Sequence, residues 1–234
     1  MMLPVLEILI FLIITFFLFS LTQRGKKPKK AVPPKPDIKT NNIIEKTADD
    51  KEKVALSLYE MGKVYFNKED YKKAAIYFKK AILKNPSNLI FYNSLASVYI
   101  KNNKLDKAET ILKKGLRINE DVQIYHNLGT INYQRERYKR ALGYFKKALE
   151  LEPQNAKRIF RLGLCYEKLD QINEAKDAFE KAVFLDPNNT NYLLALSRVF
   201  LKLKNIPQAK AVLKKVLSCD PNNAEAKRQL LRLK

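Results

Sequence analysis

The stretches YFKKAILKNPSN (residues 77–88) and YFKKALELEPQN (residues 144–155) repeat nearly the same phrase within one chain of 234 residues. Two further segments, AFEKAVFLDPNN (178–189) and VLKKVLSCDPNN (212–223), keep the same spacing of apolar residues and proline. Self-similarity at a fixed period is typical of proteins in which each unit packs only on its neighbours. The sequence therefore predicts an array of similar units.

Matching alanines give the period of this array. Successive alanines are 33 or 34 residues apart, and each is followed four positions later by phenylalanine or leucine. Proline stands near the end of four units, whereas Glu120 occupies that position in the second. The matching alanines are Ala74, Ala108, Ala141, Ala175 and Ala209.

The residues of one unit predict two helices. In the first unit, small or apolar residues recur at steps of three and four over residues 58–65 and again over 74–81, which places them on one face of a helix. The segment NKED (67–70) between them supplies turn and cap residues. Asn85 precedes Pro86, and a residue before proline avoids the α region, so the second helix ends there.

These units resemble the tetratricopeptide repeat, a 34-residue helix–turn–helix. We number places within each unit from its first residue, so that the units are 55–88, 89–121, 122–155, 156–189 and 190–223. The resemblance implies an all-α, right-handed superhelical solenoid of five helix pairs. In the first unit it is carried by Leu58, Met61, Gly62, Tyr65, Ala74, Phe78, Ala81 and Pro86.

Some residues depart from the repeat pattern. The second unit is one residue short, lacks its proline and has Gly115 in place of its last alanine, so we expect an altered corner between units two and three. The third unit has Asn132 where tyrosine is usual, and the fifth has Leu213 where phenylalanine is usual. Residues 224–234 predict a capping helix that gives the array, residues 51–234, a soluble end.

The N-terminal residues differ from the repeats. Residues 3–21 are almost unbroken apolar sequence, which as a helix is about as long as the hydrocarbon core of a bilayer is thick. A cleaved signal peptide would have a basic start, a shorter apolar run and a small-residue cleavage site, and these are missing. We therefore expect one transmembrane signal anchor over residues 1–23.

The segment after the anchor predicts a tether and an orientation. Residues 24–50 include KPKKAVPPKP and read as a basic, proline-rich, semi-extended juxtamembrane linker that can touch anionic lipid headgroups. Five cations within residues 24–30 follow the apolar run directly, and a cation-rich flank usually stays in the cytoplasm. We expect a single-pass protein of the cell membrane with its repeat domain in the cytoplasm.

The net charge and the composition limit the classes of function that this protein can have. Most of the net charge of +21 belongs to the repeats, where paired lysines recur on the second helices. They indicate either a solvated convex face or attraction to a membrane surface or an acidic polymer. His126, Cys165 and Cys219 are too few and too scattered to predict a metal site, a cofactor site or a catalytic pair, so we expect no enzyme.

The resemblance implies a binding site. Tetratricopeptide arrays usually bind extended peptides or partner helices on the concave surface formed by the first helices of the units. Amides there can hydrogen-bond a peptide backbone, aromatic rings supply apolar area, and cations can bind a carboxylate. The predicted groove residues are Tyr59, Lys63, Asn93, Ser97, His126, Asn127, Lys157, Phe160, Arg161 and Arg198.

A subset of these residues resembles a carboxylate clamp. Chaperone-binding members of the family hold a terminal carboxylate with Lys and Asn at places 5 and 9 of one unit, Asn at place 6 of the next, and Lys and Arg at places 2 and 6 of a third. The corresponding residues here are Asn93, Ser97, Asn127, Lys157 and Arg161, of which the last three match. The alternative is that they are ordinary polar residues of the groove.

The sequence thus favours a non-enzymatic, membrane-tethered scaffold or adaptor that binds a protein or peptide partner in its groove. One alternative is a binder of anionic lipid or nucleic acid through the basic surface, although no nucleic-acid motif is present. Another is an anchored, chaperone-like partner on the far side of the membrane. The sequence does not identify the partner.

Overall fold

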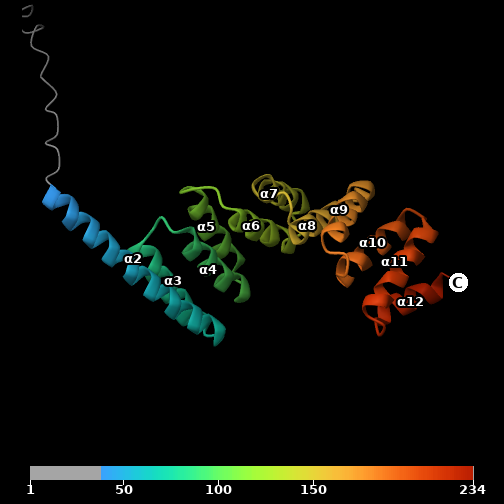
Figure 1. Cartoon of the computed structure of the whole chain (residues 1–234), viewed down its shortest axis with the longest axis horizontal. Coiled ribbons are helices and arrows are strands. Elements are labelled where there is room, and N and C mark those ends of the chain that lie inside the picture. The colour runs from blue at the N-terminus through green and yellow to red at the C-terminus, as the bar shows by residue number, and fades with distance from the viewer. Residues whose placement is uncertain (1–37, 234) are drawn as a thin grey trace, which may run out of the picture. The chain divides into compact units, whose positions relative to one another are not determined.

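The structure is a computed structural model that describes residues 38–233, with side chains from residue 49 onward. Within these residues it consists of helices, without any strand, confirming the all-α prediction (Figure 1). The helices are α2 (Ile38–Asn67), α3 (Tyr71–Lys84), α4 (Leu89–Lys101), α5 (Leu105–Leu116), α6 (Val122–Gln134), α7 (Tyr138–Leu151), α8 (Ala156–Lys168), α9 (Ile172–Leu185), α10 (Thr190–Lys202), α11 (Ile206–Cys219) and α12 (Ala224–Arg232).

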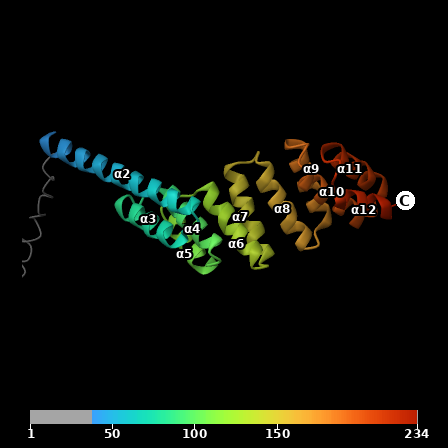
Figure 2. The ribbon, with the colours of Figure 1, turned by 90° about the horizontal axis from the view of Figure 1, so that it is seen from below.

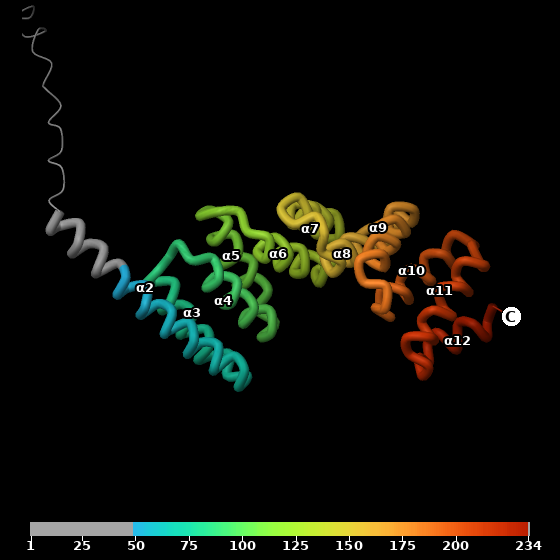
Figure 3. The backbone as a smooth tube through the Cα atoms, viewed as in Figure 1, coloured from blue at the N-terminus to red at the C-terminus, as the bar shows by residue number. Residues whose placement is uncertain are grey.

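The five predicted helix pairs are present in the compact unit Thr47–Lys234. From unit two on, each first helix packs on its own second helix, and each second helix also contacts the first helix of the next unit. Figures 2 and 3 show this alternation continuing to α12, which packs on α11 at the predicted position of the cap. The helical solenoid is therefore confirmed, whereas its right-handed superhelix stays a prediction.

Helix α2 begins earlier than the sequence predicted. It starts at Ile38, so the expectation that residues 24–50 are semi-extended was wrong for residues 38–50. These residues contain neither proline nor glycine. Because adding residues to an existing helix avoids a second nucleation step, the helix of the first unit extends toward the N-terminus.

Asparagine or aspartate caps most of the described helices, but α5, α7 and α9 have no side-chain cap. Asp70 accepts a hydrogen bond from the amide of Lys73 at 3.0 Å, which confirms the capping role of the NKED segment. The first helices of units two to five and α12 are capped in the same way, because a short polar side chain satisfies an amide that has no partner within the helix. These caps are Asn88, Asp121, Asn155, Asn189 and Asn223.

The turn inside each unit needs one left-handed residue. Place 15 has a φ between 53° and 59° in all five units, and none of these residues is glycine. A Cβ atom is crowded in this conformation, so the turns are held against local strain by the helices that they join. The five residues are Glu69, Asn103, Glu136, Asp170 and Lys204.

A glycine on the first helix allows the two helices of a unit to approach closely. A methyl group at Gly129 would lie 2.6 Å from a ring carbon of Phe145, and at Gly62 or Gly163 it would lie 2.5 Å from the equivalent phenylalanine. Phe145 is fully buried. In units one, three and four the phenylalanine ring therefore occupies the space that the glycine leaves empty.

Units two and five use a different combination of volumes at the same places. Their first helices carry Ala96 and Ser197 instead of glycine, and their second helices carry the shorter Leu112 and Leu213 instead of phenylalanine. All four residues are fully buried. The larger residue on one helix thus accompanies the smaller residue on the other, as a close-packed interior requires.

The corner between units two and three has its own backbone conformation. The other four second helices end in a residue with φ between −134° and −142°, directly before a proline. Helix α5 instead ends at Arg117 in the helical region, and the amide of Ile118 donates to the carbonyl of Gly115 at 2.9 Å. Helix α5 therefore ends two places earlier in the repeat than the other second helices, and without the extended residue that precedes proline in them, so the predicted change at this corner is present.

The predicted anchor, residues 1–23, lies outside the described residues. In the part of the chain that the structure describes, no helix combines the length and the apolar character needed to cross a bilayer.

We predict that Phe145→Ala lowers the free energy of unfolding by about 3–5 kcal/mol, because it removes a buried ring and leaves a cavity beside Gly129. Chemical denaturation followed by circular dichroism measures this change. Lys146→Ala, at an exposed neighbouring position, is the control and should change it by less than about 0.5 kcal/mol. Equal effects of the two substitutions would show that the ring does not hold the pair together.

Candidate partner-binding site

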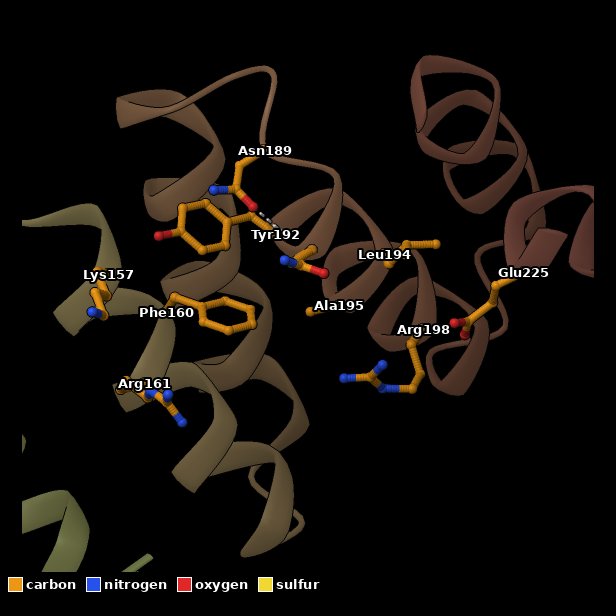
Figure 4. Close-up of a pocket in the computed structure, with 10 residues that line it drawn as sticks. Lys157, Phe160, Arg161, Asn189, Tyr192, Leu194, Ala195, Arg198 and Glu225 are labelled. Carbon is orange, nitrogen blue, oxygen red and sulfur yellow. Dashed lines mark hydrogen bonds between the residues drawn. The ribbon is translucent and has the colours of Figure 1, made fainter. Parts of the chain in front are cut away.

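A cleft of about 440 Å³ lies on the first helices of the last two units and on the cap (Figure 4). We call it the α8–α12 cleft. Four of the predicted groove residues line it together, namely Lys157, Phe160, Arg161 and Arg198. Its other lining residues are Asn189, Asn191, Tyr192, Leu194, Ala195 and Glu225.

The spacing of residues on α8 positions three of these side chains. Phe160 and Arg161 lie three and four residues after Lys157, so the three side chains share a face of the helix. The ring of Phe160 lies 4.6 Å from that of Tyr192 and 5.4 Å from that of Phe179, measured between ring centres. This aromatic contact fixes Phe160 as an apolar wall beside the two cations.

The cations of α8 are available to a ligand. Lys157 is exposed and Arg161 is half-buried, and neither forms an ion pair within residues 49–233. In Figure 4 both lie on one side of the cleft, with Glu225 on the opposite side. An extended peptide carrying a carboxylate near Arg161 would therefore find complementary charge at that side.

Arg198 is committed to another residue. Its guanidinium donates to both carboxylate oxygens of Glu167 at 2.8 and 2.9 Å, and Lys202 lies 3.2 Å from the same carboxylate. Burial by itself would raise the pKa of Glu167, but hydrogen bonds and charge from Arg198 and Lys202 lower it. Arg198 lines the cleft while its guanidinium is held by Glu167, and its role in binding a partner stays a prediction.

The first three residues of the predicted clamp lie in a different part of the array. The amide of Asn127 donates to the side-chain oxygen of Asn93 at 3.2 Å, and Asn93 donates to Asp121 at 2.9 Å. Ser97 donates to the backbone oxygen of Asn93 at 2.9 Å. These polar groups link units two and three, while Lys157 and Arg161 line the α8–α12 cleft.

Tyr59 and Lys63 lie on the first unit, away from this cleft. The ring of Tyr59 is 5.6 Å from Phe78 and 5.3 Å from Phe91, so it packs between two helices. The ammonium group of Lys63 is exposed, 3.0 Å from Glu60 and 5.4 Å from the centre of the Tyr59 ring. The structure does not bring these two residues together with the four of the cleft.

His126 is buried rather than presented to a ligand. Only 9% of the residue is exposed, and its ring centre lies 5.6 Å from that of Phe145. Burial, together with the charges of Arg158, Lys157 and Arg161, lowers its pKa to about 4. The prediction of His126 as a groove residue is corrected, because the imidazole faces the interior of the helix pair and is neutral at pH 7.

Several cleft residues were missed from the sequence. Asn191 and Leu194 occupy places 2 and 5 of unit five, and Glu225 is the second residue of α12. The same places were used to select Lys157 and Phe160, so the repeat register could have identified these three. That rule could not identify Asn189 and Tyr192. Asn189 is a helix cap and Tyr192 is a buried ring, and both line the cleft only because α8 packs on α10.

Catalytic or metal chemistry has no visible centre in the described part of the chain. No three His, Cys, Asp or Glu side chains come close enough there to hold a metal ion. Cys165 is buried, and burial raises the pKa of its thiol to about 12, which keeps it protonated and unreactive. The arrangement of the α8–α12 cleft is suited to binding.

Comparisons with protein families agree with this fold. Residues 65–130 match the family described as tetratricopeptide repeat, and residues 133–216 match the family described as anaphase-promoting complex, cyclosome, subunit 3. These two matches cover different parts of the helical array, and solved tetratricopeptide structures share its fold.

Curated relatives share only part of their length with this chain. The BBSome complex member BBS4 of Bos taurus is 30% identical over 122 residues, 52% of this chain and 22% of that protein. Stress-induced-phosphoprotein 1 of Caenorhabditis elegans is 27% identical over 74 residues, 32% of this chain and 23% of that protein. The chain thus spans less than a quarter of the length of these relatives.

Solved structures cover more of the chain. The tetratricopeptide protein YrrB, whose structure has an unusual peptide-binding site, superposes with a TM-score of 0.64 at 21% identity, over 79% of this chain and 96% of YrrB. Pseudomonas aeruginosa pilF superposes with a TM-score of 0.70 at 21% identity, over 79% of this chain and 84% of pilF. At such identities the likeness establishes the fold alone.

We predict that acid destabilises the fold through His126. The unfolded chain binds a proton near pH 6.5, whereas the native imidazole does so only near pH 4, so stability rises with pH between these values. Lowering the pH from 7 to 5 should cost about 2 kcal/mol of unfolding free energy. Denaturant titrations at both pH values measure it.

The variant His126→Leu isolates this contribution. It removes the titrating group while keeping an apolar side chain against Phe145, so its stability should change by less than about 0.5 kcal/mol between pH 7 and 5. A loss as large as that of the unaltered protein would assign the acid sensitivity to other groups.

Proposed function

We propose that this protein is a non-enzymatic, membrane-tethered scaffold that holds a segment of a protein partner in the α8–α12 cleft. The observation that carries the proposal is the convergence of Lys157, Arg161 and the ring of Phe160 on one open cleft, with both cations unpaired within residues 49–233. Few other arrangements leave two cations beside an apolar wall without a partner inside the protein.

The chemistry of the cleft favours an extended peptide with a carboxylate. Asn191 offers an exposed amide, Phe160 and Leu194 offer apolar area, and Arg161 can bind a carboxylate through two parallel hydrogen bonds. Asn127 is one of the three residues that match the carboxylate clamp, and its amide is hydrogen-bonded to Asn93. The proposed contact therefore uses units four and five and does not require the complete clamp.

The comparisons support a binding role. YrrB, a tetratricopeptide protein described with an unusual peptide-binding site, supports a peptide-binding role as a proposal for this chain. The BBS4 and anaphase-promoting complex names describe members of multiprotein assemblies. We extend this kind of role to the present chain as a proposal, with a partner defined only by its chemistry.

Membrane tethering is the second part of the proposal. Residues 3–21 are long and apolar enough for one span, and the basic residues 24–30 favour a cytoplasmic repeat domain. A scaffold fixed in this way would recruit its partner to the membrane surface. The attached basic segment would add contact with anionic headgroups.

We predict that Lys157→Ala with Arg161→Ala abolishes partner capture. Removal of two charge-assisted hydrogen bonds should weaken binding on the order of 100-fold. Crosslinking of the full chain in native membranes, followed by quantitative mass spectrometry, measures the loss of each captured protein.

The matched control removes two cations from a second helix, as Lys214→Gln with Lys215→Gln. Both lysines are exposed on α11, so the control should retain capture, and both variants should remain helical and membrane-bound. The reverse result, with the cleft variant silent and the α11 variant inactive, would favour binding of an anionic surface instead.

We predict for topology that a reporter fused after Lys234 is protected from reagents outside the cell. Replacing the five cations of residues 24–30 by glutamine should lower the fraction of protected reporter, because those cations retain their flank in the cytoplasm. Ready labelling of the unaltered fusion from outside would place the repeats on the far side of the membrane.

A further inference from the structure

A second cleft, of about 710 Å³, lies between the second helices of units two and three, above α6. We call it the α5–α7 cleft. Judged by their places in the repeat, its residues lie on the side of the helix pairs opposite to the side that carries Lys157 and Arg161. It shares no residue with the α8–α12 cleft. The lining residues are Glu109, Lys113, Tyr125, Asn132, Arg140, Gly143, Tyr144 and Lys147.

The next pair of units provides an internal comparison. A cleft between α7 and α9 shares six of its places with the α5–α7 cleft, namely 4, 11, 19, 22, 23 and 26, and has a volume of about 410 Å³. At places 19, 22 and 26 it carries Glu174, Asp177 and Lys181, where the α5–α7 cleft carries arginine, glycine and lysine. Equivalent positions in one chain thus form a small cleft with two acids and a large cleft with two cations.

Two residues of this cleft are shorter than those at the same places of unit four, whereas Tyr144 is larger than its counterpart Ala178. Place 11 is Asn132 in unit three, whereas it is Tyr166 in unit four and an aromatic residue in every other unit. Place 22 is Gly143, whereas it is Asp177 in unit four. Asn132 is buried and donates to the backbone oxygen of Leu128 at 2.8 Å, which turns its amide away from the position that a ring would fill.

Gly143 has no packing role that explains it. A Cβ atom added there would meet nothing within 4 Å, unlike at Gly62, Gly129 and Gly163, where it would meet a phenylalanine ring. Glycine within a helix is less favourable than alanine. Glycine at this position therefore lowers the stability of the helix. Its missing side chain leaves open space in the α5–α7 cleft.

Two tyrosines give the cleft an aromatic wall. The ring centres of Tyr125 and Tyr144 are 6.5 Å apart, and the hydroxyl of Tyr125 donates to Glu120 at 2.8 Å. Burial, followed by the hydrogen bond and charge of Glu120, raises the pKa of Tyr125 to about 12, so it remains neutral. The wall can therefore contact an aromatic or other apolar side chain of a ligand.

The charge of the cleft is positive. Lys113, Arg140 and Lys147 line it beside the carboxylate of Glu109. Lys147 also lies 2.7 Å from Glu150, in an exposed pair of a kind that is weak in water and that a ligand carboxylate can replace. Glu109 is already paired with Lys113 at 2.7 Å and with Arg135, and these partners lower its pKa. Arg140 forms no ion pair between residues 49 and 233, so its charge is open to a ligand.

The length of the cleft limits what it can hold. Its residues on α7 extend from Arg140 to Lys147, which corresponds to about 10 Å along the helix. An extended peptide advances about 3.3 Å per residue, so roughly three residues fit. The aromatic wall suits the middle residue, and the cations near both ends suit acidic neighbours.

We propose that the α5–α7 cleft is a second binding site, which takes a short acidic segment of a protein with an aromatic residue between two carboxylates. The glycine at position 143 keeps the site open, Tyr125 and Tyr144 contact the ring, and Arg140 and Lys147 bind the carboxylates. This site is independent of the α8–α12 cleft.

The test uses the purified full chain in detergent and the blocked peptide acetyl-Glu-Phe-Glu-amide with a fluorinated ring. Fluorine NMR of the peptide measures its binding. The full chain should bind the peptide with saturation below a few millimolar, and an otherwise identical peptide with glutamine in place of glutamate should bind at least tenfold more weakly.

Two substitutions at one position separate filling of the cleft from folding. Gly143→Leu should reduce binding at least tenfold because its side chain enters the cleft, while Gly143→Ala should leave binding within about twofold. Both variants should keep or increase thermal stability, because alanine and leucine favour the helix more than glycine does. Arg140→Gln with Lys147→Gln should weaken binding at least tenfold, whereas Lys157→Ala with Arg161→Ala should not change it.

Several results would overturn the proposal. These are an absence of saturable binding to the unaltered chain, equal binding by Gly143→Leu, or equal binding of the glutamine peptide. Loss of binding only in the Lys157 and Arg161 variant would place the peptide in the α8–α12 cleft. Binding of ATP at this site, with no binding of the peptide, would replace the proposed segment with a nucleotide.

Discussion

Contact between a phenylalanine ring and a glycine determines how closely the two helices of a unit approach. At Gly129 even a methyl group would lie 2.6 Å from Phe145, so the pair is built around the absence of a side chain. Every later contact depends on this distance. The second helix of a unit must also meet the next first helix, and small residues such as Ala141 and Ala148, both fully buried, leave room for it. Units two and five reach a similar separation by exchanging volume between the helices.

The sequence was sufficient for the helices because each is specified by local features. Periodic apolar residues, an Asn or Asp cap and a closing proline can all occur within one helix and its two ends, as in the segment from Asp70 to Pro86. The start of α2 was mispredicted because it depends on extension of a helix that is stabilised elsewhere. The left-handed conformation of Glu136 and Lys204 was also hidden, since neither residue type favours it and only the geometry of the turn demands it.

The candidate site was predictable only where the place of a residue in the repeat determines by itself whether its side chain is exposed. Register correctly placed Lys157, Phe160 and Arg161 on one cleft. It could not show that Glu167 neutralises Arg198, because that carboxylate lies on the preceding unit, 31 residues away. It also could not show that His126 turns toward Phe145 and that Asn93 pairs with Asn127. These outcomes depend on side-chain packing, within one unit for His126 and Phe145 and between neighbouring units for the other two contacts.

The contacts that join one unit to the next also have a consequence for synthesis. Asn93 meets Asp121 across 28 residues, Arg198 meets Glu167 across 31, and Asn127 meets Asn93 across 34. Such short sequence separations favour rapid folding, and domains form from the N-terminus as the chain emerges from the ribosome. Each unit of this chain can complete its contacts as soon as the following helix has been translated. Little apolar surface then waits for distant residues, which shortens the period during which nascent units can aggregate.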